Sequence, residues 1–333
     1  MSEARARWSF RVSTSMGTGA IGVIDVMGDI DAFFDDAGME PVEVGAIRLR
    51  DILGLDTGLV ARWGGGFAQL MAHGGVFLVG TIMGALQEAG GELACPSPDD
   101  ERLLAWYPEA VDVHEARMLA CLPRVTCQRA IGLLLDQPER WRTYDGDEES
   151  REVVEHSRVL NRMLAAPLVV LVGGANIGKS TLTNAMAMDS VSVVSSEAGT
   201  TRDHVGVELL VDGLAVRWVD TPGLRQGPAH EAELGAAEMS EALARRADLV
   251  VLCRDRDTGF PSWNELEGQG CLRVGLRGDM GEAPGCEIQT ASGVDRRGLG
   301  ELSRAIRERL VPEEAMESAL PWRFWDGLER CQT

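Results

Sequence analysis

The residues that most clearly suggest chemistry lie in a glycine-rich segment that holds the only lysine of the chain. Residues 173–180 read Gly-Gly-Ala-Asn-Ile-Gly-Lys-Ser and match the phosphate-binding pattern GxxxxGK[ST]. Glycines let backbone N–H groups curl around phosphates, and a helix expected at residues 181–188 adds the positive end of its dipole. Lys179 should therefore reach the β- and γ-phosphates of a nucleotide, and Ser180 should ligate Mg²⁺. The nucleotide contacts predicted from this segment are Gly173, Asn176, Ile177, Gly178, Lys179, Ser180 and Thr181.

A second set of candidate residues follows an apolar run at residues 215–219. Asp220 begins the segment Asp-Thr-Pro-Gly, and a carboxylate at the end of a strand is suited to hold Mg²⁺ through water. Gly223 offers a flexible backbone N–H to the γ-phosphate. Between the two sites, residues 198–203 read Ala-Gly-Thr-Thr-Arg-Asp. Alone they could be just a loop, but in this position a threonine can close over the metal, which predicts a switch.

These loops need a scaffold that brings the ends of several strands together. The apolar run at residues 168–172 is suited to a buried strand, residues 271–275 resemble another, and from residue 168 onward strands alternate with helices. This alternation predicts an α/β domain with a mostly parallel sheet and helices on both faces. Residues 111–164 show helical spacing, interrupted by a polar stretch at 142–152.

The chain is expected to divide into four parts. Residues 1–110 mix short apolar runs with glycine-rich turns, which indicates an α+β domain. Strands are predicted at 8–12, 20–27 and 42–49, and a helix at 77–89. The parts are an α+β domain at 1–110, a helical segment and linker at 111–164, a P-loop domain at 165–310 and a C-terminal tail at 311–333.

Composition excludes several classes of protein. The 52 acidic residues outnumber the 32 basic ones and give a formal net charge of −20, which argues against coating nucleic acid by electrostatics alone. The seven cysteines form no CxxC pair and are odd in number, so neither a disulfide framework nor a zinc site is expected. No segment has the pattern of a signal peptide or a membrane span. We therefore expect a reduced, cytoplasmic protein without membrane association.

Three segments together resemble a known family. GGANIGKST, AGTTRD and DTPGLR are similar to the G domain of the Era-like translational GTPases, and most closely to the tRNA-modification GTPase family MnmE, also called TrmE. The resemblance implies binding of GTP and GDP, Mg²⁺-dependent hydrolysis, and Thr201 as the switch threonine on Mg²⁺. It also implies that Asn176 helps to hold K⁺ in place of an arginine finger. The alternative is that the Asn176 amide only stabilises its loop.

The base-reading motif of the family, NKxD, is degenerate in this chain. Its best match is Leu-Arg-Gly-Asp at residues 276–279, in which Asp279 can accept two hydrogen bonds from guanine and Arg277 can lie over the base. Charged hydrogen bonds contribute ~1.5–3 kcal/mol, whereas the neutral bond lost with Leu276 contributes only ~0.5–1.5 kcal/mol. Guanine preference should survive in weakened form, or, alternatively, base selectivity has been lost. The residues that match the loop reading guanine O6 are Thr290, Ala291 and Ser292.

The glutamate that polarises the attacking water in the family falls at Ala232 of this chain. Glu231 and Glu233 flank that position, and either could serve after a small shift of the switch. A carboxylate one residue away along a helix points ~100° off, so slow catalysis is expected. The alternative is that both glutamates are solvated surface charges.

The resemblance extends more faintly to the N-terminal region. Residues 18–24, 72–75 and 87–94 are similar to segments of the folate-binding domain of the family, which dimerises, so a homodimer is expected. The TGED segment of the family is replaced at 63–66 by Trp-Gly-Gly-Gly, and its glutamate by Gln69, which makes folate binding and one-carbon chemistry doubtful. The second half of the family's helical domain and its terminal CxGK motif have no counterpart, which suggests a truncated, divergent member.

Three biological roles stay open from the sequence. The first, implied by the resemblance, is modification of the wobble uridine of tRNA together with tRNA or a partner protein. The second is a regulatory GTP switch on a scaffold that has lost the one-carbon chemistry. The third is a nucleotide-binding module that scarcely hydrolyses. Folate binding and complementation of a tRNA-modification defect separate the first from the others, and turnover in K⁺ against Na⁺ separates the second from the third.

Overall fold

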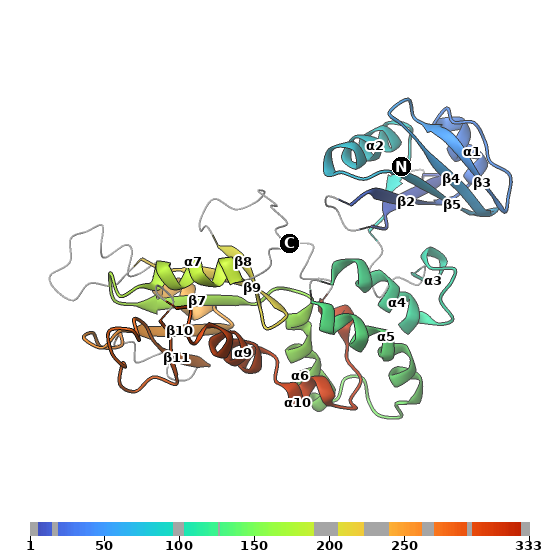
Figure 1. The fold of residues 1–333 in the computed structure, drawn as a ribbon. Helices are drawn as coiled ribbons and strands as arrows, with labels where there is room; N and C mark the ends of the chain where they lie inside the picture. The colour runs from blue at the N-terminus through green and yellow to red at the C-terminus, as the bar shows by residue number, and fades with distance from the viewer. Residues whose placement is uncertain are drawn as a thin grey trace. The chain divides into compact units, whose positions relative to one another are not determined.

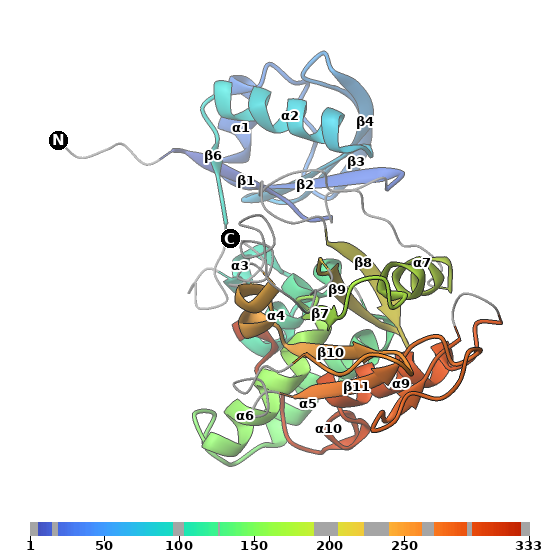
Figure 2. The same cartoon turned by 90° about the vertical axis from the view of Figure 1, so that its left-hand side faces the viewer.

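In the computed structural model, the chain divides between residues 124 and 125 into an N-terminal and a C-terminal unit. The described residues are 6–14, 19–95, 103–125, 127–189, 206–222, 240–261, 270–291 and 295–327. Each unit has its own sheet, as Figures 1 and 2 show, and each is described by itself.

The N-terminal unit is built on a six-stranded sheet of order β3-β4-β5-β2-β1-β6, in which only the β1–β6 pair is parallel. Its elements are β1 (Trp8–Val12), β2 (Ile21–Gly28), α1 (Ile30–Asp36), β3 (Ala46–Ile52), β4 (Asp56–Gly64), β5 (Phe67–His73), α2 (Val76–Glu88) and β6 (Glu92–Leu93). Side chains alternate between the faces of a sheet, and Ile24, Leu70 and Ile82 belong to the core on the face that α1 and α2 cover. The α3 (Leu103–Trp106), α4 (Val113–Cys121) and η1 (Leu122–Arg124) helices follow.

Most sequence-based expectations for this unit are confirmed. Strands occupy the predicted positions at 8–12 and 20–27, and α2 covers the helix predicted at 77–89. The strand predicted at 42–49 begins only at Ala46. The reason is a turn at Gly45, whose φ of +81° lies in the left-handed region that interrupts an extended strand.

The C-terminal unit contains a second six-stranded sheet, of order β12-β11-β10-β7-β9-β8. All neighbours are parallel except the β8–β9 hairpin at the edge. Its elements are β7 (Leu168–Gly173), α7 (Lys179–Asp189), β8 (Val207–Val211), β9 (Leu214–Asp220), β10 (Leu249–Arg254), β11 (Cys271–Gly275), β12 (Ile288–Gln289) and α9 (Leu299–Leu310). Consecutive residues 169–172 of β7 are all fully buried, so both faces of this central strand are covered, as predicted for a parallel α/β sheet.

Helices that precede and follow this sheet pack together in the same unit. They are α5 (Gln128–Thr143), α6 (Arg151–Leu160), η2 (Asn161–Met163), α10 (Glu313–Glu317) and η4 (Phe324–Gly327). The predicted polar interruption at 142–152 matches the connection between α5 and α6. The α6 helix begins there because the side chain of Ser150 accepts a hydrogen bond from the backbone N–H of Val153.

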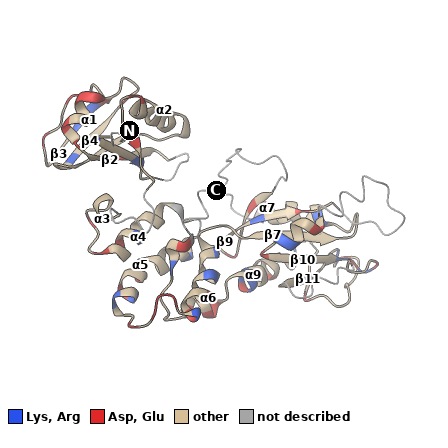
Figure 3. Ribbon diagram, turned by 180° about the vertical axis from the view of Figure 1, so that it is seen from behind, with Lys and Arg blue, Asp and Glu red and all other residues tan. Residues whose placement is uncertain are grey.

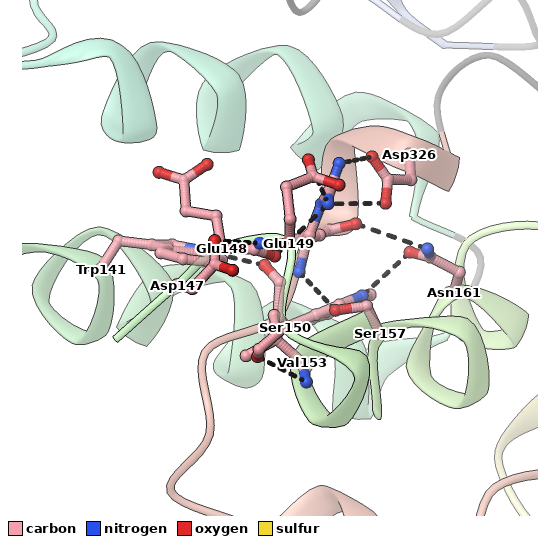
Figure 4. Close-up of polar contacts among 11 residues, drawn as sticks. Trp141, Asp147, Glu148, Glu149, Ser150, Val153, Ser157, Asn161 and Asp326 are labelled. Atoms are coloured by element: carbon pink, nitrogen blue, oxygen red, sulfur yellow. Dashed lines mark hydrogen bonds and ion pairs between the residues drawn. The ribbon is translucent and has the colours of Figure 1, made fainter. Parts of the chain in front are cut away.

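Residues 318–327, which we call the C-terminal strap, pack against α5 and α6. The backbone N–H of Trp322 donates to Gln137 Oε1 at 2.7 Å, and its indole donates to Asn161 Oδ1 at 2.9 Å. The backbone N–H of Arg323 donates to Ser157 Oγ at 2.8 Å. Figure 4 shows Ser157 and Asn161 pointing toward this segment. The sequence had indicated only a tail at 311–333, whereas these contacts fix the strap to helices that precede the sheet in the chain.

The predicted fold class, a P-loop α/β domain preceded by an α+β domain and helices, is confirmed. None of the described helices combines the length and the apolar content that a membrane span requires.

Candidate nucleotide-binding site

The phosphate-binding loop connects the end of β7 to the start of α7, as the sequence predicts. Its backbone enters the left-handed region twice, at Asn176 (φ 61°) and at Gly178 (φ 105°). Asparagine is one of the few residues besides glycine that tolerate this region. Gly173 must also be small, because a Cβ there would lie 2.5 Å from the carbonyl oxygen of Cys253 on β10. The sequence of the loop is therefore dictated by its shape as well as by any ligand.

The single lysine lies folded against this loop. Lys179 Nζ donates to the carbonyl oxygens of Gly174 at 2.9 Å and Gly173 at 3.3 Å, and the residue is only 6% exposed. Burial lowers the pKa of Lys179 below its usual value, and the nearby carboxylate of Asp220 offsets this only in part. A buried ammonium with a lowered pKa is stabilised when an anion approaches, so the position favours phosphate binding.

Ser180 and Asp220 meet at the ends of neighbouring strands. Leu171 of β7 lies opposite Asp220 of β9 in the parallel register, and Ser180 Oγ donates to Asp220 Oδ2 at 2.6 Å. Asp220 Oδ1 is buried and has no hydrogen-bond partner among the described residues. Buried polar atoms usually have a partner, and hydroxyl and carboxylate oxygens are the ligands that Mg²⁺ prefers. The residues present therefore fit a magnesium ion held between the P-loop serine and Asp220.

Arg277 connects the predicted base-reading loop to the P-loop. Its Nη2 donates to the carbonyl oxygen of Asn176, and its Nη1 lies 3.5 Å from Asp255 Oδ2. Its stem passes Gly178, where a Cβ would lie 3.8 Å from Arg277 Cγ. Asp279 lies in the same loop and is exposed. The structure thus brings Arg277 to the rim of the phosphate site, with Asp279 two residues further along.

The second predicted base-reading loop is held against the first by backbone hydrogen bonds. The N–H of Gly278 donates to the carbonyl of Thr290 at 2.8 Å, and the N–H of Thr290 donates to that of Gly275 at 2.8 Å. The hydroxyl of Thr290 donates to the same carbonyl of Gly275 at 3.1 Å. Thr290 and Ala291 are buried, so they support the loop from beneath, and only their backbone is suited to contact a base.

The described part of the chain thus unites most of the predicted site. The carboxyl ends of β7, β9, β11 and β12, or the segments that follow them, position the P-loop residues 173–181, Asp220, Arg277, Thr290 and Ala291. Ile177 is buried and packs inward, while Thr181 is exposed. The predicted residues Thr201, Gly223, Glu231, Glu233 and Ser292 lie outside the described residues.

One residue of this site was missed by the sequence reasoning. Asp255 directly follows β10 and is almost buried, and its Oδ1 accepts the backbone N–H groups of Asp257 and Thr258 at 3.1 and 2.9 Å. Its other carboxylate oxygen faces Arg277. The available signal was a carboxylate at the end of an apolar strand, the same signal that identified Asp220. We conclude that Asp255 orients Arg277.

A glycine-rich loop between a parallel strand and a helix, with Ser180 and Asp220 in contact beside it, is the arrangement typical of a P-loop α/β domain. A family model described as "50S ribosome-binding GTPase" matches residues 168–270. The chain is also similar to curated proteins named tRNA modification GTPase MnmE.

Individual proteins are similar to this chain over part of its length. The MnmE of Acidiphilium cryptum is 40% identical over 46% of this chain and 35% of its own length. That of Thermus thermophilus is 31% identical over 74% of this chain and 58% of its own length. The chain therefore spans between about a third and somewhat more than half of these two relatives. A crystal structure of Era from Aquifex aeolicus bound to GDP·AlF4⁻ matches 44% of this chain and 57% of that chain, with 23% identity and a TM-score of 0.34.

Proposed function

We propose that the protein binds GTP and hydrolyses it to GDP with Mg²⁺. The observation that carries the proposal is the meeting of Lys179, Ser180 and Asp220 at the ends of β7 and β9. The GTPase family match and the names of the MnmE relatives support the same activity. A GTP-dependent release of phosphate by the purified chain, absent without Mg²⁺, tests it.

The P-loop residues would bind the phosphates directly. Lys179 would replace its hydrogen bonds to the carbonyl oxygens of Gly173 and Gly174 by hydrogen bonds to oxygens of the β- and γ-phosphates. Its buried ammonium would then have negatively charged partners. Backbone N–H groups at the start of α7 would add their positive dipole end. These contacts neutralise charge without any large movement of the loop.

Ser180 and Asp220 would hold the magnesium ion, with Thr201 closing over it. The ion would supply positive charge that stabilises the negative charge developing during phosphoryl transfer. In the proposed reaction Gly223 donates its N–H to the γ-phosphate, and Glu231 or Glu233 orients the attacking water. Because neither glutamate matches the family position, we propose slow turnover.

Arg277 and Asp279 are proposed to select guanine. Asp255 and the carbonyl of Asn176 hold the Arg277 guanidinium beside the P-loop, where its plane can lie against a base. The carboxylate of Asp279 would accept hydrogen bonds from N1–H and the N2 amino group of guanine. Adenine offers neither donor at this edge.

Replacing Asp279 by asparagine is therefore expected to move the preference from guanine to xanthine nucleotides. The new amide can donate to the O2 of xanthine but cannot accept from both guanine donors. GTP affinity should fall by about 10- to 100-fold, as for one or two charged hydrogen bonds, in a titration with fluorescent nucleotides. Asp257→Asn, at a neighbouring exposed carboxylate, is the matched control. Equal affinity of the unchanged protein for GTP and ATP would show that base selectivity is lost.

We further propose that Asn176 helps to hold a K⁺ ion that accelerates hydrolysis. Turnover should be faster in KCl than in NaCl at equal ionic strength. Asn176→Gly is the informative variant because glycine adopts the φ of 61° without strain while removing the amide oxygen. We expect it to bind GTP within about twofold of the unchanged protein and to lose the response to K⁺. Equal rates in both salts would exclude the potassium site.

For the biological role, we propose a GTP-dependent factor related to tRNA wobble-uridine modification, acting in the cytoplasm with tRNA or a partner protein. One observation favours the alternative of a GTP switch without one-carbon chemistry. Both ends of the Gln69 amide have partners within the protein, since Nε2 donates to Asp25 Oδ1 at 2.9 Å and Oε1 accepts from the Trp63 indole at 2.6 Å. Asp25 is itself buried against Arg11 at 2.9 Å. Folate titration together with complementation of a wobble-modification defect decides between the two.

The N-terminal unit is proposed to form a homodimer. On the sheet face opposite α1 and α2, a row of apolar residues crosses four strands in register, namely Leu49, Leu59, Met71 and Val23. Leu49 is 63% and Leu59 45% exposed. Exposed apolar surface of this kind is typical of an interaction face, and a second copy is the partner that the family resemblance implies. Light scattering of a monomer at micromolar concentration would refute this proposal.

A further inference from the structure

A cluster of charges around one buried arginine joins the sheet of the C-terminal unit to the neighbouring helices. Arg307 of α9 has only 8% of its side chain exposed. Its Nε donates to Asp212 Oδ2 at 3.0 Å, and its Nη1 contacts Glu308 at 2.5 Å and Glu313 at 3.1 Å. Glu313 of α10 also pairs with Arg129 of α5 at 3.0 Å. We call these five residues the ion cluster. Figure 3 marks the positions of the acidic and basic residues on the ribbon of α9.

Arg307 stays charged in this cluster. Burial alone would lower its pKa, but the hydrogen bond to Asp212 and the charges of Glu308 and Glu313 raise the pKa above its usual value. A buried cation whose partners move away is strongly destabilised, because the low dielectric leaves its charge uncompensated. Breaking one ion pair of Arg307 at a time is therefore unfavourable, and we expect the members of the cluster to move together.

Asp212 ties the cluster to the nucleotide site through a rigid element. It occupies the two-residue turn of the β8–β9 hairpin, with φ of 47° at Asp212 and 84° at Gly213, the geometry that closes tight hairpins. The two strands pair without interruption from Val207 opposite Trp218 to Val211 opposite Leu214. At the far end of β9, Asp220 accepts a hydrogen bond from Ser180. One end of the hairpin thus lies at the P-loop serine and the other at Arg307.

On the other side of the ion cluster, Glu313 connects Arg307 to the helices α10 and α5. Glu313 lies in the first turn of α10, where Met316 is buried. Residues from both sides, including Arg129, Met163, Asp212 and Met316, line a small hollow beside Arg307. The α9 helix ends at Leu310, and the chain passes through Val311 and Pro312 into α10 and then into the strap. A displacement of Asp212 would therefore reach α10 and α5 through side chains that are already in contact.

We infer that the ion cluster transmits nucleotide occupancy from the β8–β9 hairpin to α10 and α5, with Arg307 as the positioning residue that connects them. The inference rests on the nucleotide binding proposed above. When Asp220 and Ser180 exchange their mutual hydrogen bond for nucleotide and metal, the hairpin shifts, and Asp212 carries the shift to Arg307. Nucleotide binding would therefore alter the position or mobility of α10 and α5, without altering the catalytic groups of the site.

Hydrogen–deuterium exchange of the full chain tests this route. Exchange is measured without nucleotide, with GDP and with a non-hydrolysable GTP analogue, always with Mg²⁺. In the unchanged protein we expect the analogue to protect residues 173–180 and to alter exchange in residues 128–143 and 313–317. In Arg307→Met and Asp212→Asn we expect the P-loop protection to remain and the change at the helices to disappear. Asparagine is chosen because it tolerates the left-handed turn while losing the charge.

The control is a substitution of another arginine of α9 that lies outside the ion cluster. Arg309→Met removes an exposed arginine of the same helix that pairs with Glu287, and it should behave like the unchanged protein. A helix response that persists in both Arg307→Met and Asp212→Asn would overturn the inference. So would protection of the P-loop in the unchanged protein without any response at 313–317. Absence of P-loop protection by any nucleotide is a different result, because it refutes the proposed function and the coupling with it.

Discussion

Lys179→Ala is expected to weaken binding of both GTP and GDP by at least about 100-fold, the largest functional effect of any single substitution in this chain. Lys179 would contact two phosphates, and charged hydrogen bonds contribute ~1.5–3 kcal/mol each, which corresponds to two or more powers of ten in affinity. The fold should survive, because burial already lowers the pKa of Lys179 and its present partners are only two loop carbonyls. Isothermal titration with each nucleotide measures the loss.

A matched substitution tests whether charge alone is sufficient. Lys179→Arg keeps the positive charge but replaces a compact ammonium with a planar, wider group. The ammonium fits between the carbonyls of Gly173 and Gly174, within 3.3 Å of both, so we expect the arginine variant to bind nucleotide almost as weakly as the alanine variant. Thermal unfolding without nucleotide confirms that both variants fold. Nucleotide affinity of Lys179→Ala within twofold of the unchanged protein would overturn the assignment of this loop.

Trp322→Ala is expected to produce the largest loss of stability, lowering the free energy of unfolding of the C-terminal unit by about 3–5 kcal/mol. The Trp322 side chain is fully buried. The substitution removes its hydrogen bond to Asn161 and leaves that amide without its indole partner. Its ring also packs against Phe324, with centroids 6.0 Å apart. Urea unfolding followed by circular dichroism measures the change.

Two comparisons make the stability prediction specific. Trp322→Phe keeps most of the buried area but loses the indole donor, so an intermediate loss is expected. Met280→Ala changes a side chain of the same unit that is 62% exposed, and it should alter the unfolding free energy by no more than about 0.5 kcal/mol. If Trp322→Ala were no more destabilising than Met280→Ala, residues 318–327 would not be fixed to α5 and α6 in solution.

The phosphate site could be predicted from the sequence because it is encoded locally. The strand at 168–172, the glycine loop and the helix that begins at Lys179 are contiguous, and each has its own hydrophobic or glycine signal. Asp220 was also accessible, because a carboxylate directly after an apolar strand lies at the functional edge of a parallel sheet. Local sequence was therefore enough to predict a phosphate-binding loop.

Contacts between distant segments could not be predicted in the same way. Arg277 reaches the carbonyl of Asn176 across 101 residues, and Trp322 reaches Gln137 across 185. Neither contact leaves a periodic pattern in the sequence, since each depends on which strands and helices become neighbours. The position of Asp255 directly after an apolar strand was a usable signal, but its contact with Arg277 appears only once β10 lies beside β11. The motif at residues 276–279 was thus visible in the sequence, whereas the contacts that hold Arg277 beside the P-loop appear only in the fold.

The burial of the only lysine has a practical consequence for proteolysis. A lysine-specific endoprotease has a single target bond in this chain, the one that follows Lys179, and it would divide the protein into fragments 1–179 and 180–333. That bond lies in the first turn of α7, beside a side chain that is 6% exposed, so cleavage requires this turn to open. The rate of cleavage at this bond therefore measures how often the first turn of α7 opens, without any label. A bound nucleotide is expected to slow the appearance of the two fragments on a gel.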